Sequence, residues 1–175
     1  KVQLRYAFHH DLRHIRVDVT QVRQVVMNLV TNAGDAMRGK RGTITLSTGG
    51  LTADASYLAD SLVNPDLPAG DYVFLEVTDD GCGMDDETRE RLFDPFFTTK
   101  TAGRGLGMAA VLGIVRGHQG DIRVTSQPGQ GSCFRVLLPA TEAPRTQPQP
   151  TTDCEPGTLK GRTVLVVDDD DVVRA

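Results

Sequence analysis

The stretch Val77–Met84, which reads VTDDGCGM, is the part of the sequence on which the fold assignment depends. An apolar run typical of a buried strand ends at Asp79, and a turn built on Gly81 and Gly83 follows. An aspartate at such a place can accept a hydrogen bond from an exocyclic amine, as on adenine, and glycines let a flat ring lie against the backbone. An ordinary Asp-Gly turn explains the stretch equally well, so the neighbouring motifs have to decide.

A long amphipathic helix is predicted upstream, over Asp18–Arg38, because apolar residues recur there every three to four positions. Its first residue can cap the start, and Gly39 can end it. Asn28 and Asn32 lie one turn apart and project from the same side, with Asp35 one further turn along. Two carboxamide oxygens at this spacing can ligate a hard cation such as Mg²⁺, although hydrogen bonds to neighbouring loops also suit such a pair.

Downstream, glycines at positions 103, 105 and 107 lead into an apolar helix predicted over Leu106–Gly117. Glycines that open a helix leave free N–H groups and the positive helix end to phosphate oxygens, and Lys100 and Arg104 add positive charge nearby. The segment Gly105–Ala110 also fits the dinucleotide pattern GxGxxA, but no predicted strand precedes it and no βαβ unit surrounds it. The sequence contains no standard P-loop.

Composition excludes several classes of protein. The chain has 175 residues, close to the length of one domain of ~100–200 residues, and its 19 basic and 23 acidic residues give a net charge of −4. That balance provides no basic field for nucleic acid. No apolar run approaches the ~18 residues of a membrane span, and none resembles a signal segment. Three widely spaced cysteines argue against a disulfide scaffold or a zinc cluster. We therefore expect a reducing, cytoplasmic location, while a membrane tether elsewhere in a longer protein stays open.

Shorter helices and several strands complete the predicted elements. The strands are Gln3–Phe8, Thr43–Thr48, Tyr72–Thr78, Asp121–Ser126 and Cys133–Leu138, and the helices are Asp85–Leu92 and Leu106–Gly117. Because they do not alternate as βαβ units, we expect an α+β fold, a two-layer α/β sandwich whose mixed sheet carries helices on one face. The polar insertion Leu51–Gly70 has a short helix near Ala55–Leu62 and no assigned chemistry.

The composition changes near Pro139, where we place the end of the compact domain, residues 1–139. Residues 140–159 are rich in proline, threonine and glutamine, as linkers are. Residues 160–175 contain the apolar run Val164–Val167 followed by four aspartates. We interpret this last segment as the truncated start of a second domain.

The order of these motifs is more specific than any one of them. Between the two glycine motifs lies Phe93–Phe97 (FDPFF), and Gly129–Phe134 forms a closing hairpin. This series resembles the ATP-binding catalytic domain of bacterial sensor histidine kinases, in the gyrase-like ATPase superfamily, which has the Bergerat-type fold. The segment Thr163–Asp171 resembles the first strand and acidic pair of a response-regulator receiver domain. Together they resemble part of a hybrid histidine kinase.

The resemblance implies ATP and Mg²⁺ as ligands. It places the adenine amine at Asp79, the metal at Asn28 and Asn32, and phosphoryl transfer at Asn28 and Lys100. The residues it assigns to nucleotide binding are Asn28, Asn32, Asp35, Asp79, Gly81, Gly83, Met84, Lys100, Gly103, Arg104, Gly105, Leu106, Gly107 and Ser132. Phe93, Phe96 and Phe97 would fix the root of the ATP lid, although three aromatics also suit an ordinary core. Asp168 and Asp169 would be an incomplete magnesium site of the receiver domain.

The implied activity is donation of the γ-phosphoryl group to a histidine on a separate dimerisation and phosphoacceptor domain upstream, with a receiver domain downstream and no nucleic-acid partner. The fragment alone is then expected to be a monomer. A gyrase- or chaperone-like ATPase is the first alternative, but Asn28 stands where its hydrolases carry Glu, and an amide cannot act as a base. A non-catalytic nucleotide-sensing module is the second. His9, His10 and His14 are interpreted as surface residues, and His118, near a helix end, as a residue that complements the helix dipole or packs.

Overall fold

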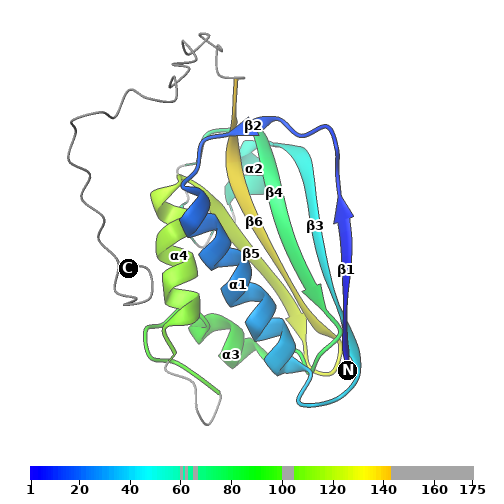
Figure 1. Cartoon of the computed structure of the whole chain (residues 1–175). Coiled ribbons are helices and arrows are strands. Elements are labelled where there is room, and N and C mark those ends of the chain that lie inside the picture. Colours follow the sequence, from blue (N-terminus) through cyan, green and yellow to red (C-terminus); the bar gives the residue numbers. More distant parts are fainter. Residues whose placement is uncertain (60, 62, 65–66, 100–104, 143–175) are drawn as a thin grey trace, which may run out of the picture. The chain divides into compact units, whose positions relative to one another are not determined.

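The computed structural model (Figure 1) describes residues 1–59, 61, 63–64, 67–99 and 105–142, which lie within the unit Lys1–Pro144. The elements are β1 (Val2–Phe8), β2 (His14–Ile15), α1 (Val19–Ala36), β3 (Gly42–Ala53), α2 (Ala55–Ala59), β4 (Gly70–Asp79), α3 (Asp86–Arg91), α4 (Gly107–Gly117), β5 (Asp121–Gln127) and β6 (Gly131–Thr141). The predicted second domain and most of the predicted linker fall on residues 143–175, outside the described residues.

The strands form one mixed sheet in the order β1-β3-β4-β6-β2, and β5 pairs with β6. The β1–β3 pair is parallel and the other pairs are antiparallel. Helices α1 and α4 lie side by side on one face of this sheet (Figure 1). The predicted α+β sandwich with a mixed sheet is confirmed.

The main core lies between the sheet and these two helices. The helices bury every third or fourth residue, namely Val25, Leu29 and Ala33 of α1 and Met108, Val111 and Val115 of α4. The buried strand residues that they meet are Ile44, Leu46, Val77, Ile122, Phe134, Val136 and Leu138. Burying one large aliphatic side chain contributes roughly 1.5–3 kcal/mol, so this face carries much of the stability.

The start of α1 and the end of α4 are tied together by side chains. Asp18 caps α1 as predicted, because its Oδ1 accepts the N–H groups of Thr20 and Gln21 at 2.7 and 3.1 Å. His118 Nε2 accepts the N–H of Asp18 at 3.0 Å, and its Nδ1 lies 2.8 Å from the carbonyl oxygen of Ile114. His118 thus lies at the helix end, as predicted, and the two contacts fit a ring that carries hydrogen on Nδ1; they support the packing role, while the role of complementing the helix dipole stays a prediction.

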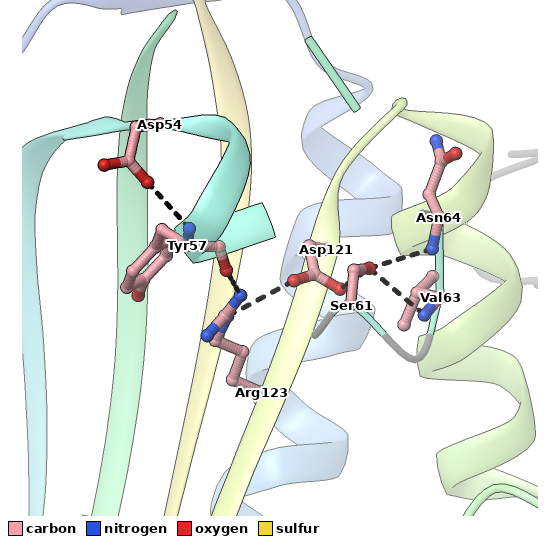
Figure 2. A network of polar contacts seen from close by, with 7 residues as sticks. All are labelled: Asp54, Tyr57, Ser61, Val63, Asn64, Asp121 and Arg123. Atoms are coloured by element: carbon pink, nitrogen blue, oxygen red, sulfur yellow. Dashed lines mark hydrogen bonds and ion pairs between the residues drawn. The ribbon is translucent and has the colours of Figure 1, made fainter. Parts of the chain in front are cut away.

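Helix α2 of the insertion packs on the opposite face of the sheet, so the expectation that the helices occupy one face holds for α1 and α4 but not for α2, whereas Val63 of the same insertion belongs to the main core. A second core on this opposite face contains Ala53, Leu58, Leu67, Tyr72 and Leu137. Figure 2 shows how polar contacts fasten this segment to β5. Ser61 Oγ donates to Asp121 Oδ1 at 2.7 Å, and Arg123 pairs with Asp121 and donates to the carbonyl oxygen of Tyr57.

Strand lengths differ from the prediction at two places. β3 continues to Ala53 and β6 to Thr141, beyond the alternating patterns that predicted them. β6 extends past Pro139 because its last residues pair with β2, where His14 faces Thr141 and Ile15 faces Ala140. A two-residue strand such as β2 has no periodicity of its own, so sequence patterns do not predict it.

Candidate functional site

A row of polar residues crosses the sheet at the end of β4. Asp79 pairs with Ser132 of β6, which pairs in turn with Ser126 of β5. Paired residues of adjacent strands point to the same face, and the preceding row on that face contains the core residues Val77 and Phe134. The polar row therefore lies one step beyond the main core, on the face that carries α1 and α4.

Asp79 is an almost completely buried carboxylate, with 5% of its surface exposed. Its Oδ1 accepts the N–H of Gly81 at 2.8 Å. Burial raises the pKa of Asp79, while hydrogen bonds from the backbone of Gly81 and Ser132 act in the opposite direction and the charge of Asp80 adds to the increase. The side chain is thus held in place as a hydrogen-bond acceptor whose charge is costly to keep in the unligated protein.

The turn after Asp79 is packed between two parts of the fold. The N–H of Cys82 donates to the carbonyl oxygen of Ala36 at the end of α1, at 3.0 Å, and the carbonyl oxygen of Cys82 accepts from Gly129 N–H at 2.7 Å. Gly83 has φ +63°, and a Cβ on it would collide with the carbonyl oxygen of Gln127. The glycine is required here by backbone conformation and by close backbone packing.

The two asparagines of α1 are half-buried, and Asp35 is exposed. Asn28 lies against the first turn of α4, since a Cβ placed on Gly107 would come within 3.0 Å of Asn28 Oδ1. Gly107 is the first residue of α4, and Leu106 before it provides no side-chain cap. By contrast, Asp18 caps α1 and Asp85 caps α3. The structure therefore brings Asn28 next to the uncapped N-terminus of α4.

The aromatic segment meets the start of α4 through its backbone. The N–H of Phe96 donates to the carbonyl oxygen of Gly105 at 3.0 Å, and Gly105, with φ +65°, has no space for a Cβ beside the backbone of Phe96 and Phe97. Phe93 packs against the main core, whereas the Phe96 side chain is 75% exposed and its φ is +68°. The core interpretation is therefore confirmed for Phe93 and wrong for Phe96. Lys100, Gly103 and Arg104 lie outside the described residues.

Ser126 belongs to this site and was not predicted from the sequence. Its Oγ accepts the N–H of Met84 at 2.8 Å and lies 3.0 Å from both Ser132 Oγ and the carbonyl oxygen of Gly131. Met84 thus contributes a backbone contact, while its side chain packs on the main core. The predicted hairpin Gly129–Phe134 is the sequence signal that could have placed Ser126 opposite Ser132.

Among the described residues, no group of three or more His, Cys, Asp or Glu side chains is arranged to hold a metal ion. In the same described part of the chain, no helix is long and apolar enough to cross a membrane.

Comparisons with known proteins identify the family of this chain. The sequence pattern of the family described as "Histidine kinase-, DNA gyrase B-, and HSP90-like ATPase" matches residues 17–142. The sensor kinase CckA of Brucella abortus (strain 2308) is 37% identical over 183 aligned residues, which cover 99% of this chain and 19% of that protein. The signal transduction histidine-protein kinase AtoS of Escherichia coli (strain K12) is 37% identical over 130 residues, covering 74% of this chain and 18% of that protein. The chain thus spans about a fifth of the length of these curated relatives.

Solved structures show the same fold. The catalytic domain of histidine kinase ThkA superposes with a TM-score of 0.60 at 28% identity, over 80% of each chain. Full-length ShkA in complex with AMPPNP superposes with a TM-score of 0.61 at 25% identity, over 81% of this chain and 26% of that one. The chain belongs to the histidine kinase-, DNA gyrase B- and HSP90-like ATPase family, and it contains the ATP-binding domain of the sensor histidine kinase type.

Proposed function

We propose that this chain binds ATP with Mg²⁺ and donates the γ-phosphoryl group to a histidine on a separate phosphoacceptor domain. The single observation that carries the proposal is the buried Asp79 carboxylate, set at the end of the sheet in a glycine turn that packs against α1. The names of the relatives, which are sensor kinases, support it.

Asp79 is proposed to receive the adenine amine. A buried carboxylate is an acceptor, and it favours a base that presents N–H groups over one that presents a carbonyl oxygen at the same position. Gly81 and Gly83 would shape the base site indirectly, because they let the turn pack closely against Ala36 and Gln127 and so fix the backbone beside Asp79. The nucleotide complex of the similar ShkA supports a nucleotide at this domain.

The phosphates are proposed to lie at the start of α4. Its N-cap residue, Leu106, provides no side-chain cap for the first N–H groups, and such N–H groups suit phosphate oxygens. Asn28, which lies against that first turn, and Asn32 would hold Mg²⁺ through their amide oxygens, and the ion would neutralise phosphate charge. Lys100 and Arg104 would add positive charge near the phosphates, and Asp35 would lie beside them. The residues proposed to form the ATP lid and its root are Gly103, Gly105, Leu106 and Gly107.

Transfer to a histidine fits these residues better than hydrolysis. Asn28 has no basic lone pair with which to deprotonate water, whereas phosphoryl transfer depends mainly on positioning and on neutralising charge. The incoming histidine supplies its own nucleophilic nitrogen. We therefore propose that hydrolysis without a partner is slow.

The partner domains belong to the proposal as well. A histidine phosphoacceptor and dimerisation domain would lie upstream, and residues 160–175 would begin a receiver domain with Asp168 and Asp169 as part of its magnesium site. The alignment with CckA extends over 99% of this chain and so includes this last segment. A cytoplasmic location of this domain accompanies the proposal.

The test has two stages. Calorimetry with AMPPNP, with and without Mg²⁺, measures binding; labelled ATP with a purified histidine phosphoacceptor domain then measures transfer. Transfer of labelled phosphate to the histidine would support the proposed kinase function. Rapid phosphate release without the partner would show an ATPase, and binding without transfer to any partner would show a nucleotide-sensing module.

A further inference from the structure

Ser126 is a buried hydroxyl at the centre of the polar row. It is 8% exposed and Ser132 is 6% exposed. Three polar groups surround Ser126 Oγ: the N–H of Met84 at 2.8 Å, the carbonyl oxygen of Gly131 at 3.0 Å and Ser132 Oγ at 3.0 Å. Met84 belongs to the turn after Asp79, and Gly131 and Ser132 belong to β6. The Ser126 side chain therefore connects both of these segments to β5.

Only one arrangement of protons satisfies all three contacts. A hydroxyl has one hydrogen to donate and two lone pairs to accept with. The Met84 N–H can only donate and the Gly131 carbonyl can only accept, so the Ser126 hydrogen goes to Gly131. The contact with Ser132 then requires that the Ser132 hydroxyl donates to Ser126.

This proton arrangement has a consequence for the pocket. With its hydrogen committed to Ser126, Ser132 can offer only lone pairs to a ligand. Its register partner is Asp79, which also accepts when ionised. The pair therefore presents acceptors alone at the place where the proposed function puts the base.

We propose that Ser126 is a positioning residue that sets the hydrogen-bond polarity of the base pocket and thereby its preference for a base with an exocyclic amine. This inference rests on the proposed nucleotide-binding function. Without Ser126, the Ser132 hydrogen loses its acceptor and can be donated to a carbonyl oxygen of a base, so the site loses part of its discrimination against oxo-purines.

The experiment compares ADP with inosine diphosphate, in which a carbonyl replaces the amine, by calorimetry on the full chain. In the parent chain we expect ADP to bind more tightly by a factor on the order of 10–100. Ser126→Ala should lower this ratio by about fivefold or more, whatever it does to overall affinity. Ser126→Thr keeps the hydroxyl and should restore the ratio. Thr125→Ala removes an exposed hydroxyl from the preceding residue of β5 and should leave the ratio unchanged.

A merely structural serine would give a different result. If Ser126→Ala weakens ADP and inosine diphosphate by the same factor, the inference is overturned, even if the melting temperature falls. Should Ser126→Ala fail to fold, Ser126→Cys keeps most of the volume, weakens the same hydrogen bonds and is read by the same ratio. A parent chain that binds neither nucleotide would instead contradict the proposed function.

Discussion

Replacing Asp79 by Asn separates the binding role of this residue from its structural role. The change removes a buried charge, keeps an oxygen that can accept from Gly81, and presents an amide donor to the adenine amine. A hydrogen bond to a charged group is worth about 1.5–3 kcal/mol, so ADP affinity should fall about 10- to 150-fold. Calorimetry on the purified chain measures this loss.

The stability of the unligated variant should move in the opposite direction. Burial raises the pKa of Asp79, which means that folding opposes its ionisation at neutral pH. The introduced amide carries no charge, so the unligated melting temperature should stay level or rise. Asp80→Asn is the matched control: its Oδ1 accepts the N–H of Thr43 at 2.8 Å, and the loss of its charge only eases the ionisation of Asp79, so ADP affinity should not fall. If Asp79→Asn lowers stability and affinity together, or Asp80→Asn weakens ADP as much, the reasoning about Asp79 is refuted.

The pH dependence follows from the same shift. Because the pKa of Asp79 is higher in the folded than in the unfolded chain, its contribution to stability is full below the unfolded value and is lost as pH rises through the folded value. ADP affinity should change in the opposite sense, falling as pH decreases through the folded value, since a protonated carboxyl is a weaker acceptor. Calorimetry and thermal melts across this range should show both trends in the parent chain, and Asp79→Asn should remove this component of each.

Three further predictions concern the metal, the glycine turn and the insertion. Asn32→Ala should lower the affinity for Mg²⁺-AMPPNP much more than the affinity for metal-free AMPPNP, both measured by calorimetry, and equal losses would show that the Asn32 amide has only a structural role. Gly83→Ala should lower the free energy of unfolding by about 2 kcal/mol or more, because φ is +63° and the Gln127 carbonyl occupies the Cβ position, whereas Gly113→Ala, in an open position of α4, should be neutral or stabilising in the same denaturation assay. Ser61→Ala leaves the fully buried Asp121 without its hydroxyl donor and should cost about 1–3 kcal/mol in urea unfolding while ADP affinity stays unchanged; a loss of affinity would connect the insertion to the site.

Elements with a strong local pattern were predictable. The helix over residues 18–38 shows helical periodicity and a capping aspartate, and both act between residues that are close in sequence. The strand that ends at Asp79 and its glycine turn are equally local. Even so, the sequence suggested that the glycines make room for a ligand, whereas Gly83 is already required by the carbonyl oxygen of Gln127.

The sequence by itself determined which residue types were available and where the helices and strands would form, because propensity, capping and periodicity are properties of neighbouring residues. Only the tertiary structure decided which of those residues meet. Ser126 reaches Met84 across 42 positions, and Ser61 reaches Asp121 across 60. Such contacts depend on strand register and on the face to which a segment folds, and a shift of register by one residue would turn Ser126 away from Ser132. The tight hairpin fixes the pairing of Ser126 with Ser132 locally, but no local pattern encodes the contact with Met84 or the face to which the insertion folds. The complete proton arrangement at Ser126 and the place of the insertion therefore follow from the tertiary structure, because they join residues that are far apart in the sequence.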